Sequence, residues 1–156
     1  MNISWESYFM GIALLSAKRS KDPNTQVGAC IVNGDNKIVG IGYNGMPTQC
    51  DESVLPWGRD GDTLLDTKYP FVCHAELNAI LNSNQMSLKG CTLYATLFPC
   101  NECAKAIIQS GIKKVVYYEN KYAGTDSVRA STMLFRLAKV EMVAYTASHG
   151  DLILYV

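Results

Sequence analysis

The feature of this sequence that most restricts its fold is a pair of short segments rich in metal-binding residues, 73–76 (CHAE) and 99–103 (PCNEC). His74, Cys100 and Cys103 offer the nitrogen and sulfur ligands that zinc prefers, and catalytic zinc sites combine three protein ligands with one open position. Each segment stands where a strand-like stretch gives way to a helical one, and helix N-termini favour anionic thiolates. We therefore expect a fold that brings two helix N-termini together around one catalytic zinc ion.

The residues beside these ligands predict the chemistry of the site. The order His-x-Glu followed by Pro-Cys-x-x-Cys is the signature of zinc deaminases. Glu76 lies two residues after His74, in the first turn of the same helix, so it can lean over the metal without ligating it. We expect Glu76 to take a proton from the attacking water, deliver it to a ring nitrogen and then protonate the leaving ammonia.

Each motif has a plainer interpretation when it is taken alone. A Cys-x-x-Cys segment can be a redox pair or half of a structural zinc site, and a lone histidine at a helix start is usually a cap or a core residue. A second Cys-x-x-Cys segment is absent from the sequence. The order of the motifs, the intervening Pro99 and the helices after both favour catalysis. A structural or nucleotide-sensing zinc site would also have no use for the Glu76 carboxylate.

Hydrophobic periodicity predicts alternating strands and helices after an opening helix and hairpin. We expect one domain, 1–156, with a mixed sheet covered on both faces. A stretch of about thirty residues, 44–73, lacks periodicity, and a loop that long is usually functional or disordered. It contains Trp57, Tyr69 and Phe71, so we expect it to be packed. The expected helices span 5–19, 74–82, 101–110 (ended by Gly111) and 126–138, and the expected strands 27–33, 37–43, 91–97, 114–118 and 140–145.

Composition narrows the class of protein and its partners. Hydrophobic residues make up 48% of the chain, and 14 basic residues balance 14 acidic ones, which favours a small substrate over a polynucleotide. No apolar run approaches the ~20 residues of a membrane span, and the N-terminus lacks the pattern of a secretory signal. We expect a cytoplasmic protein, in host cytoplasm if it is viral. The cysteines then indicate metal ligands and buried thiols such as Cys30 and Cys91, although six could also form three disulfides.

With the zinc motifs and the long insert taken together, the chain resembles the deoxycytidylate (dCMP) deaminases of the cytidine deaminase superfamily. The likeness runs over roughly residues 5–118, and the Gly-Tyr-Asn-Gly segment with the long insert points to this branch. The resemblance implies an α/β fold, a three-layer α/β/α sandwich with a central five-stranded mixed sheet. It implies deamination of dCMP to dUMP and ammonia, supplying dUMP for thymidylate synthesis. It also implies a hexamer that dCTP activates and dTTP inhibits with Mg2+. The matching segments are 8–10, 20–24, 26–30, 42–47, 54–57, 66–70, 74–80 and 98–100.

The resemblance also implies roles for further residues, each with a structural alternative. Asn44 would bind the sugar hydroxyl and Asn24 would lie near the sugar or phosphate, although both could be turn residues. The base pocket would include Val27 and Phe98, which could equally be core, and Ala75 beside the metal site. The expected effector residues, in or next to the insert, are Tyr43, Asn44, Gly45, Trp57 and Arg59.

A monophosphate needs cationic or hydroxyl partners. Lys121 and Tyr122 follow the fourth strand, where the sheet edge opens, and are the candidates, with a solvated loop as the alternative.

The sequence also bears on other deaminase classes and on further ligand sites. A nucleoside cytidine deaminase typically has a third cysteine where this chain has His74. A tRNA adenosine deaminase or a polynucleotide cytidine editor should present a basic face. We expect no second zinc, and Gly40-Ile41-Gly42 lies inside a strand, so it is no dinucleotide motif. The sequence does not decide cellular or viral origin, whether dCTP is itself a substrate, or whether residues 148–156 form a strand or an interface tail.

Overall fold

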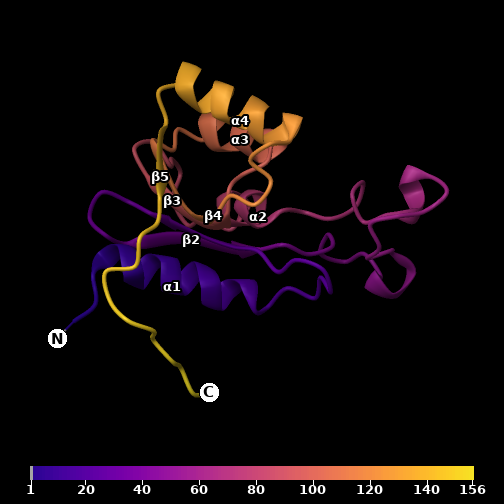
Figure 1. Cartoon of the computed structure of the whole chain (residues 1–156), viewed down its shortest axis with the longest axis horizontal. Coiled ribbons are helices and arrows are strands. Elements are labelled where there is room, and N and C mark those ends of the chain that lie inside the picture. Colours follow the sequence, from indigo (N-terminus) through magenta and orange to yellow (C-terminus); the bar gives the residue numbers. More distant parts are fainter. Residues whose placement is uncertain (1) are drawn as a thin grey trace.

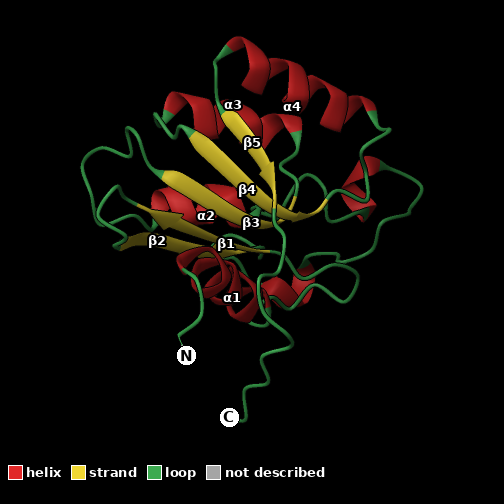
Figure 2. Cartoon of the chain, turned by 60° about the vertical axis from the view of Figure 1, so that its left-hand side comes forward, coloured by secondary structure: helices red, strands yellow, loops and turns green. Residues whose placement is uncertain are grey.

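Five strands form one mixed sheet in a computed structural model of the chain, which describes residues 2–156 (Figure 2). The strands are β1 (Gly28–Val32), β2 (Ile38–Tyr43), β3 (Thr92–Leu97), β4 (Lys114–Glu119) and β5 (Glu141–Ala144). Their order is β2-β1-β3-β4-β5; β1 pairs antiparallel with β2 and β3, whereas β3, β4 and β5 are parallel. The carboxyl ends of β3 and β4 therefore open at the same edge of the sheet, where the sites of such sheets usually lie.

Helices cover both faces of this sheet, so the expected three-layer α/β/α sandwich is confirmed (Figure 1). One helix lies on one face and three lie on the other, and every expected helix and strand is present with ends within two residues of the prediction. The helices are α1 (Trp5–Ala17), which packs alone, and α2 (Ala75–Leu81), α3 (Asn101–Gln109) and α4 (Asp126–Leu137), which share the opposite face.

The inner strand β1 explains why two layers of helices are needed. All five of its residues are buried, because successive side chains point to opposite faces and both faces are covered. Ala29 and Ile31 belong to the core beneath α2, α3 and α4, whereas Cys30 and Val32 pack with α1. Burial raises the pKa of the Cys30 thiol to about 12, in keeping with the expected role of a plain core residue.

Strand glycines, among them Gly28 and Gly42, let helices lie directly on the sheet. A Cβ at Gly28 would stand 1.9 Å from the Ala13 carbonyl oxygen of α1, and a Cβ at Gly42 would stand 2.3 Å from the Ala75 carbonyl oxygen of α2. Both neighbours are backbone atoms of a helix, which cannot move away without shifting the whole element. Glycine at 42 thus fixes how closely the helix that carries Glu76 approaches the sheet.

We expect Gly42→Ala to lower the free energy of unfolding by about 2–3 kcal/mol, because the new methyl group forces α2 away from β2. Chemical denaturation monitored by circular dichroism measures this change. Gly11→Ala is the matched control: a Cβ at Gly11, inside α1, meets nothing within 4 Å. It should raise the free energy of unfolding by about 0.5–1 kcal/mol. Equal stability of the two variants would contradict the close-contact argument.

Side chains and backbone of the α2 region also cover the free edge of β2. Because β2 is an edge strand, alternate carbonyl groups point away from β1 and need donors from elsewhere. Three donors in and after α2 satisfy them, which fixes the register of α2 along β2. The bonds run from Asn78 Nδ2 to the Tyr43 carbonyl (2.8 Å), from Asn82 Nδ2 to the Ile41 carbonyl (3.2 Å) and from Asn84 N to the Val39 carbonyl (3.0 Å).

The long insert, 44–73, begins and ends at one point beside the sheet. Gly45 and Cys73 exchange backbone hydrogen bonds of 3.0 and 2.8 Å, so the insert closes immediately before His74. It contains two short 3₁₀ turns, Glu52–Val54 and Leu64–Asp66, and extends to one side of the molecule (Figure 1). Its expected packing is only partly confirmed, because Trp57 and Phe71 are half-buried but Tyr69 is 53% exposed.

The chain after β5 leaves the sheet and passes the beginning of α1 (Figure 1). Ser148 Oγ lies 3.2 Å from Ser4 Oγ, and the residues from 149 onward are exposed and form neither helix nor strand. The alternative of an extra strand at 148–156 is therefore wrong. Among residues 2–156, no helix combines the length and apolar character needed to traverse a bilayer.

Candidate active site

The three expected zinc ligands meet at the N-termini of α2 and α3. His74 is the N-cap residue of α2, Cys100 is the N-cap of α3, and Cys103 lies in the first turn of α3. His74 Nδ1 is 3.3 Å from Cys100 Sγ and 3.6 Å from Cys103 Sγ. Tetrahedral zinc with ordinary Zn–N and Zn–S bonds requires N···S separations of about 3.5 Å, so these residues fit a zinc ion. The expected ligand set is confirmed.

Cys100 and Cys103 shift each other's pKa. The hydrogen bond from Cys103 and that from His74 lower the pKa of Cys100 to about 4, against the effect of burial. The hydrogen bond to Cys100, burial and the nearby Glu76 carboxylate raise the pKa of Cys103. Cys100 also accepts the Cys103 backbone N–H, as an N-cap does (3.5 Å). Zinc binds cysteine as the thiolate, so zinc uptake would release protons from these residues.

Glu76 is a buried carboxyl group in the first turn of α2, and only 4% of the residue is exposed. Burial raises its pKa, while the positive charge of His74 acts in the opposite direction. A carboxyl group with a raised pKa exchanges protons more readily near neutral pH than an exposed one. Its position beside the metal cluster is the one that the sequence pattern predicts for a proton carrier.

His74, Cys100 and Glu76 open into a cavity of about 370 Å³. This volume lies in the range of small-molecule sites. The walls come from the loop before β1, the insert, the carboxyl end of β3 and the beginning of α4. Its other lining residues are Asp22, Thr25, Val27, Asn44, Arg59, Lys68, Tyr69, Val72, Leu97, Phe98, Tyr122, Thr125, Ser127 and Val128.

The structure divides the remaining predicted site residues into two groups. Four of the expected substrate residues line this cavity, namely Val27, Asn44, Phe98 and Tyr122, and so does Arg59, expected as an effector residue. Asn24, Ala75 and Lys121 do not line it, nor do Tyr43, Gly45 and Trp57. Asn24 Nδ2 donates instead to the Trp57 carbonyl (3.1 Å), and the Arg19 guanidinium lies over the Tyr43 ring at 6.0 Å. The roles of these residues stay predictions.

Asn44 holds the loop before β1 in place at the cavity wall. Its Oδ1 accepts the Val27 backbone N–H (2.8 Å), and its Nδ2 donates to the Thr25 carbonyl (2.9 Å) and to Asp22 Oδ2 (3.3 Å). One lone pair of Oδ1 stays available to a ligand in the cavity. Asn44 is therefore more than a turn residue, because its side chain fixes a segment from another part of the chain.

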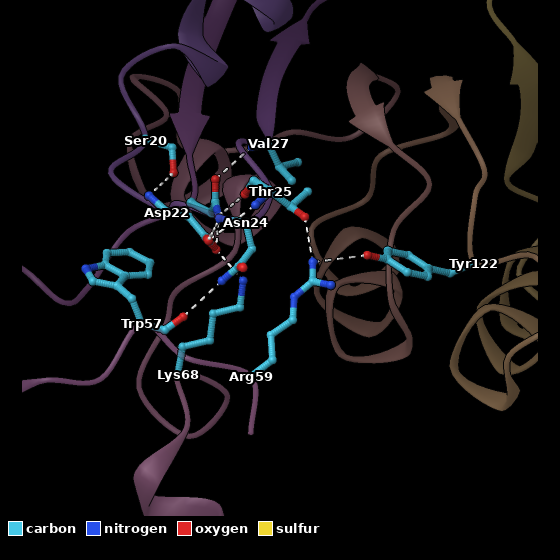
Figure 3. Close-up of polar contacts among 10 residues, drawn as sticks. Ser20, Asp22, Asn24, Thr25, Val27, Trp57, Arg59, Lys68 and Tyr122 are labelled. Carbon is cyan, nitrogen blue, oxygen red and sulfur yellow. Dashed lines mark hydrogen bonds and ion pairs between the residues drawn. The ribbon is translucent and has the colours of Figure 1, made fainter. Parts of the chain in front are cut away.

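An ion pair that the sequence did not reveal joins this loop to the insert. Asp22 and Lys68 are paired with side-chain exposures of 0% and 8%, and both line the cavity (Figure 3). Burial raises the pKa of Asp22, but the Lys68 hydrogen bond and the backbone N–H groups of Asn24 and Thr25 outweigh it and hold this pKa below its usual value. The two partners are 46 positions apart in the sequence, which explains why no local pattern predicted the pair.

We expect Lys68→Met to lower the free energy of unfolding by about 3 kcal/mol at pH 7, because it leaves a buried carboxylate without its partner. The depressed pKa of Asp22 stabilises the wild type above pH ~4, and this contribution is lost as pH falls through that pKa. The difference in the free energy of unfolding between variant and wild type should therefore shrink below pH ~4.

Denaturant titrations from pH 7 to pH 3 measure this difference. The control Lys21→Met breaks an exposed pair with Glu52 (2.9 Å), worth at most about 1 kcal/mol. A loss no larger at Lys68 than at Lys21 would contradict the prediction.

Several cavity residues were missed because their signal is tertiary. Thr125, Ser127 and Val128 begin α4 and face the cavity, although the resemblance ends near residue 118. Thr125 is recognisable in the sequence as an N-cap, and its side chain accepts the Val128 N–H (3.4 Å). Nothing local says that this helix N-terminus lies beside the zinc ligands.

Comparison with known proteins agrees with this geometry. The family model for the cytidine and deoxycytidylate deaminase zinc-binding region matches residues 3–119. The chain is 62% identical to deoxycytidylate deaminase of Homo sapiens over 138 residues, covering 88% of this chain and 78% of the relative. It is 55% identical to the Mus musculus enzyme over 152 residues, covering 97% and 85%.

A solved structure shows the same fold. The dCMP deaminase of cyanophage S-TIM5, crystallised with dCMP and dUMP, superimposes with a TM-score of 0.70 at 30% identity, covering 93% of this chain and 99% of that one. The chain belongs to the cytidine and deoxycytidylate deaminase family.

Proposed function

We propose that this chain hydrolyses dCMP to dUMP and ammonia. The observation that carries the proposal is the His74–Cys100–Cys103 cluster with buried Glu76 at one wall of a cavity of about 370 Å³. The relatives named deoxycytidylate deaminase support dCMP as the substrate, as does the cyanophage enzyme crystallised with dCMP and dUMP. The product dUMP would supply thymidylate synthesis in the cytoplasm.

Glu76 transfers the protons in this reaction. Zinc held by these ligands lowers the pKa of its water and so supplies hydroxide at neutral pH. Glu76 accepts the proton released by the attacking water and delivers it to N3 of cytosine, which makes C4 electrophilic. The same carboxyl group then carries the second proton of the attacking water to the exocyclic amine. The C4–N bond breaks, ammonia leaves, and the oxygen of the water becomes the uracil carbonyl.

Phe98 and Val27 belong to the apolar lining of the cavity, where the base would lie. Phe98 is 6% exposed, and its ring is held edge-on against Tyr117 and Phe135 at centroid distances of 4.9 and 6.0 Å. A ring fixed in this way provides a rigid wall for a planar base and keeps bulk water from Glu76. Asn44 would bind the sugar through the free lone pair of its amide oxygen.

The regulation that the resemblance implies is also a proposal for this chain. In this regulation, dCTP with Mg2+ activates the enzyme and dTTP with Mg2+ inhibits it. The residues that would bind these effectors are Tyr43, Asn44, Gly45, Trp57 and Arg59. The closure of the insert between Gly45 and Cys73 supports such coupling, because a ligand that moves this junction also moves the adjoining His74.

The exposed Trp5, Tyr8 and Leu15 on α1 support association into a hexamer, which sedimentation velocity can measure.

The proposed function is tested by ammonia release from the zinc-loaded protein. The substrates are dCMP, CMP, deoxycytidine, dCTP and tRNA, each alone and with dCTP or dTTP plus Mg2+. We expect turnover of dCMP, raised by dCTP and suppressed by dTTP. Turnover of deoxycytidine or tRNA in preference to dCMP would refute the substrate. Unchanged rates with both effectors would refute the regulation and leave the reaction standing.

A further inference from the structure

Two of the zinc ligands, Cys100 and Cys103, lie at the beginning of α3, so their positions depend on how this helix end is held. Before Cys100 the chain is fixed, because Pro99 is fully buried and the Phe98 backbone N–H donates to the Glu119 carbonyl of β4 (2.8 Å). After Cys100 the chain enters α3, whose first N–H groups have no carbonyl partner within the helix. The contacts of this second side therefore decide where the two sulfur atoms lie.

A reciprocal pair of hydrogen bonds joins the beginning of α3 to the beginning of α4. Ser127 Oγ accepts the backbone N–H of Asn101, the first residue of α3, at 3.2 Å, and it donates to Asn101 Oδ1 at 2.9 Å. Ser127 lies in the first turn of α4, 26 positions after Asn101 in the sequence. This pair, the Asn101–Ser127 clip, is therefore a tertiary contact that satisfies one of the free N–H groups of α3.

The N-cap position of α3 explains why such a contact from outside the helix is needed. Ser, Thr, Asp and Asn are usual at this position because their side-chain oxygen accepts an N–H group of the first turn. Cys100 offers a sulfur atom instead, which is a weak acceptor, and its contact with the Cys103 N–H is 3.5 Å long. The Asn101–Ser127 clip supplies from α4 the oxygen acceptor that a metal ligand at the N-cap cannot supply.

The helix that carries Ser127 is itself anchored in the core. Helix α4 lies beside α3 (Figure 1), and Val128, the residue after Ser127, is buried. Further along α4 the fully buried Phe135 ring packs edge-on against Phe98, two residues before Cys100, with the ring centroids 6.0 Å apart. Helix α4 thus contacts the second zinc segment on both sides of Cys100 and provides a rigid base for the clip.

We propose that Ser127 is a positioning residue for the metal site: through Asn101 it holds the beginning of α3 so that both cysteines stay at ligating distance from His74. The sulfur atoms lie 3.3 and 3.6 Å from His74 Nδ1, so the clip keeps a site that is already formed. Loss of a residue that orients metal ligands typically weakens metal binding by about 10- to 100-fold. The inference goes beyond the proposed function, because zinc binding can be measured without any substrate.

The test is a titration of the zinc-loaded Ser127→Ala variant with a chelator. We expect half of the zinc to be removed at a free chelator concentration about 10- to 100-fold lower than for the wild type. Ser127→Thr keeps the hydroxyl group and should stay within about threefold of the wild type. Asn101→Ala removes the acceptor of the same pair and should also weaken zinc binding. The double variant should lose less than the product of the two single factors, because both changes break one pair.

Ser110→Ala is the matched control. Ser110 is a half-buried serine at the opposite end of α3, where its Oγ donates to the Ile107 carbonyl at 2.7 Å. Its replacement removes a similar hydrogen bond and should leave zinc affinity within about twofold of the wild type. An equal loss of affinity in Ser110→Ala, or a wild-type affinity in Ser127→Ala, would overturn the proposal.

Circular dichroism shows whether each variant folds, and Asn101→Ala decides by the same criteria if Ser127→Ala does not. Failure of the proposed function gives a different result. A wild-type protein that holds zinc but does not turn over dCMP would refute the proposed reaction, whereas the comparison of zinc affinities would stand.

Discussion

Glu76→Gln is expected to lower kcat for dCMP by about 10³- to 10⁴-fold while the protein keeps its zinc. Glutamine has the size of glutamate and can fill the same buried position, but it can neither accept nor release the two protons that the reaction transfers. The cavity residues Asn44 and Phe98 are untouched, so KM should change less than about threefold. Steady-state absorbance assays on dCMP and metal analysis of the same sample measure both quantities.

Glu102→Gln is the matched control for this variant. Glu102 lies in the second zinc segment, but its side chain is 73% exposed and pairs with Lys105 at 2.9 Å. Its replacement should leave kcat within about twofold of the wild type, because an exposed pair of this kind contributes little. A Glu76→Gln variant that retains more than a tenth of the wild-type kcat, with zinc bound, would remove Glu76 from the role of proton carrier.

Cys103→Ala is expected to remove both zinc and activity. Three protein ligands hold the ion, and loss of one leaves His74 and Cys100 to bind it alone. We expect purified protein to contain less than about a tenth of a zinc ion per chain and to release no ammonia from dCMP. Loss of zinc should also reduce stability, since the ion joins the N-termini of α2 and α3. Metal analysis and thermal unfolding, with and without added zinc, measure these changes.

Cys50→Ala is the control for the removal of a thiol. Cys50 is an exposed free cysteine in the insert and is no part of the metal cluster. This variant should keep one zinc ion per chain and wild-type activity. Stoichiometric zinc in Cys103→Ala, with activity retained, would mean that another residue is the third ligand.

The sequence by itself determined the elements of the fold and the zinc ligands, because both depend on local spacing. A period of two or of 3.6 residues follows from backbone geometry, so each strand and helix leaves its pattern in a few consecutive residues. His74 and Glu76 share one helix turn, and Cys100 and Cys103 share another, so their relation within each segment is set by the helix. These are the features that the structure reproduces most closely.

Only the tertiary structure decided how the rest of the cavity is assembled. Asp22 meets Lys68 across 46 residues, and Arg59 reaches Tyr122 across 63. A charge on a loop has no period, so the sequence cannot say which partner it will find. The position of Arg59 depends on how the insert closes between Gly45 and Cys73, and this closure is a property of the packed chain.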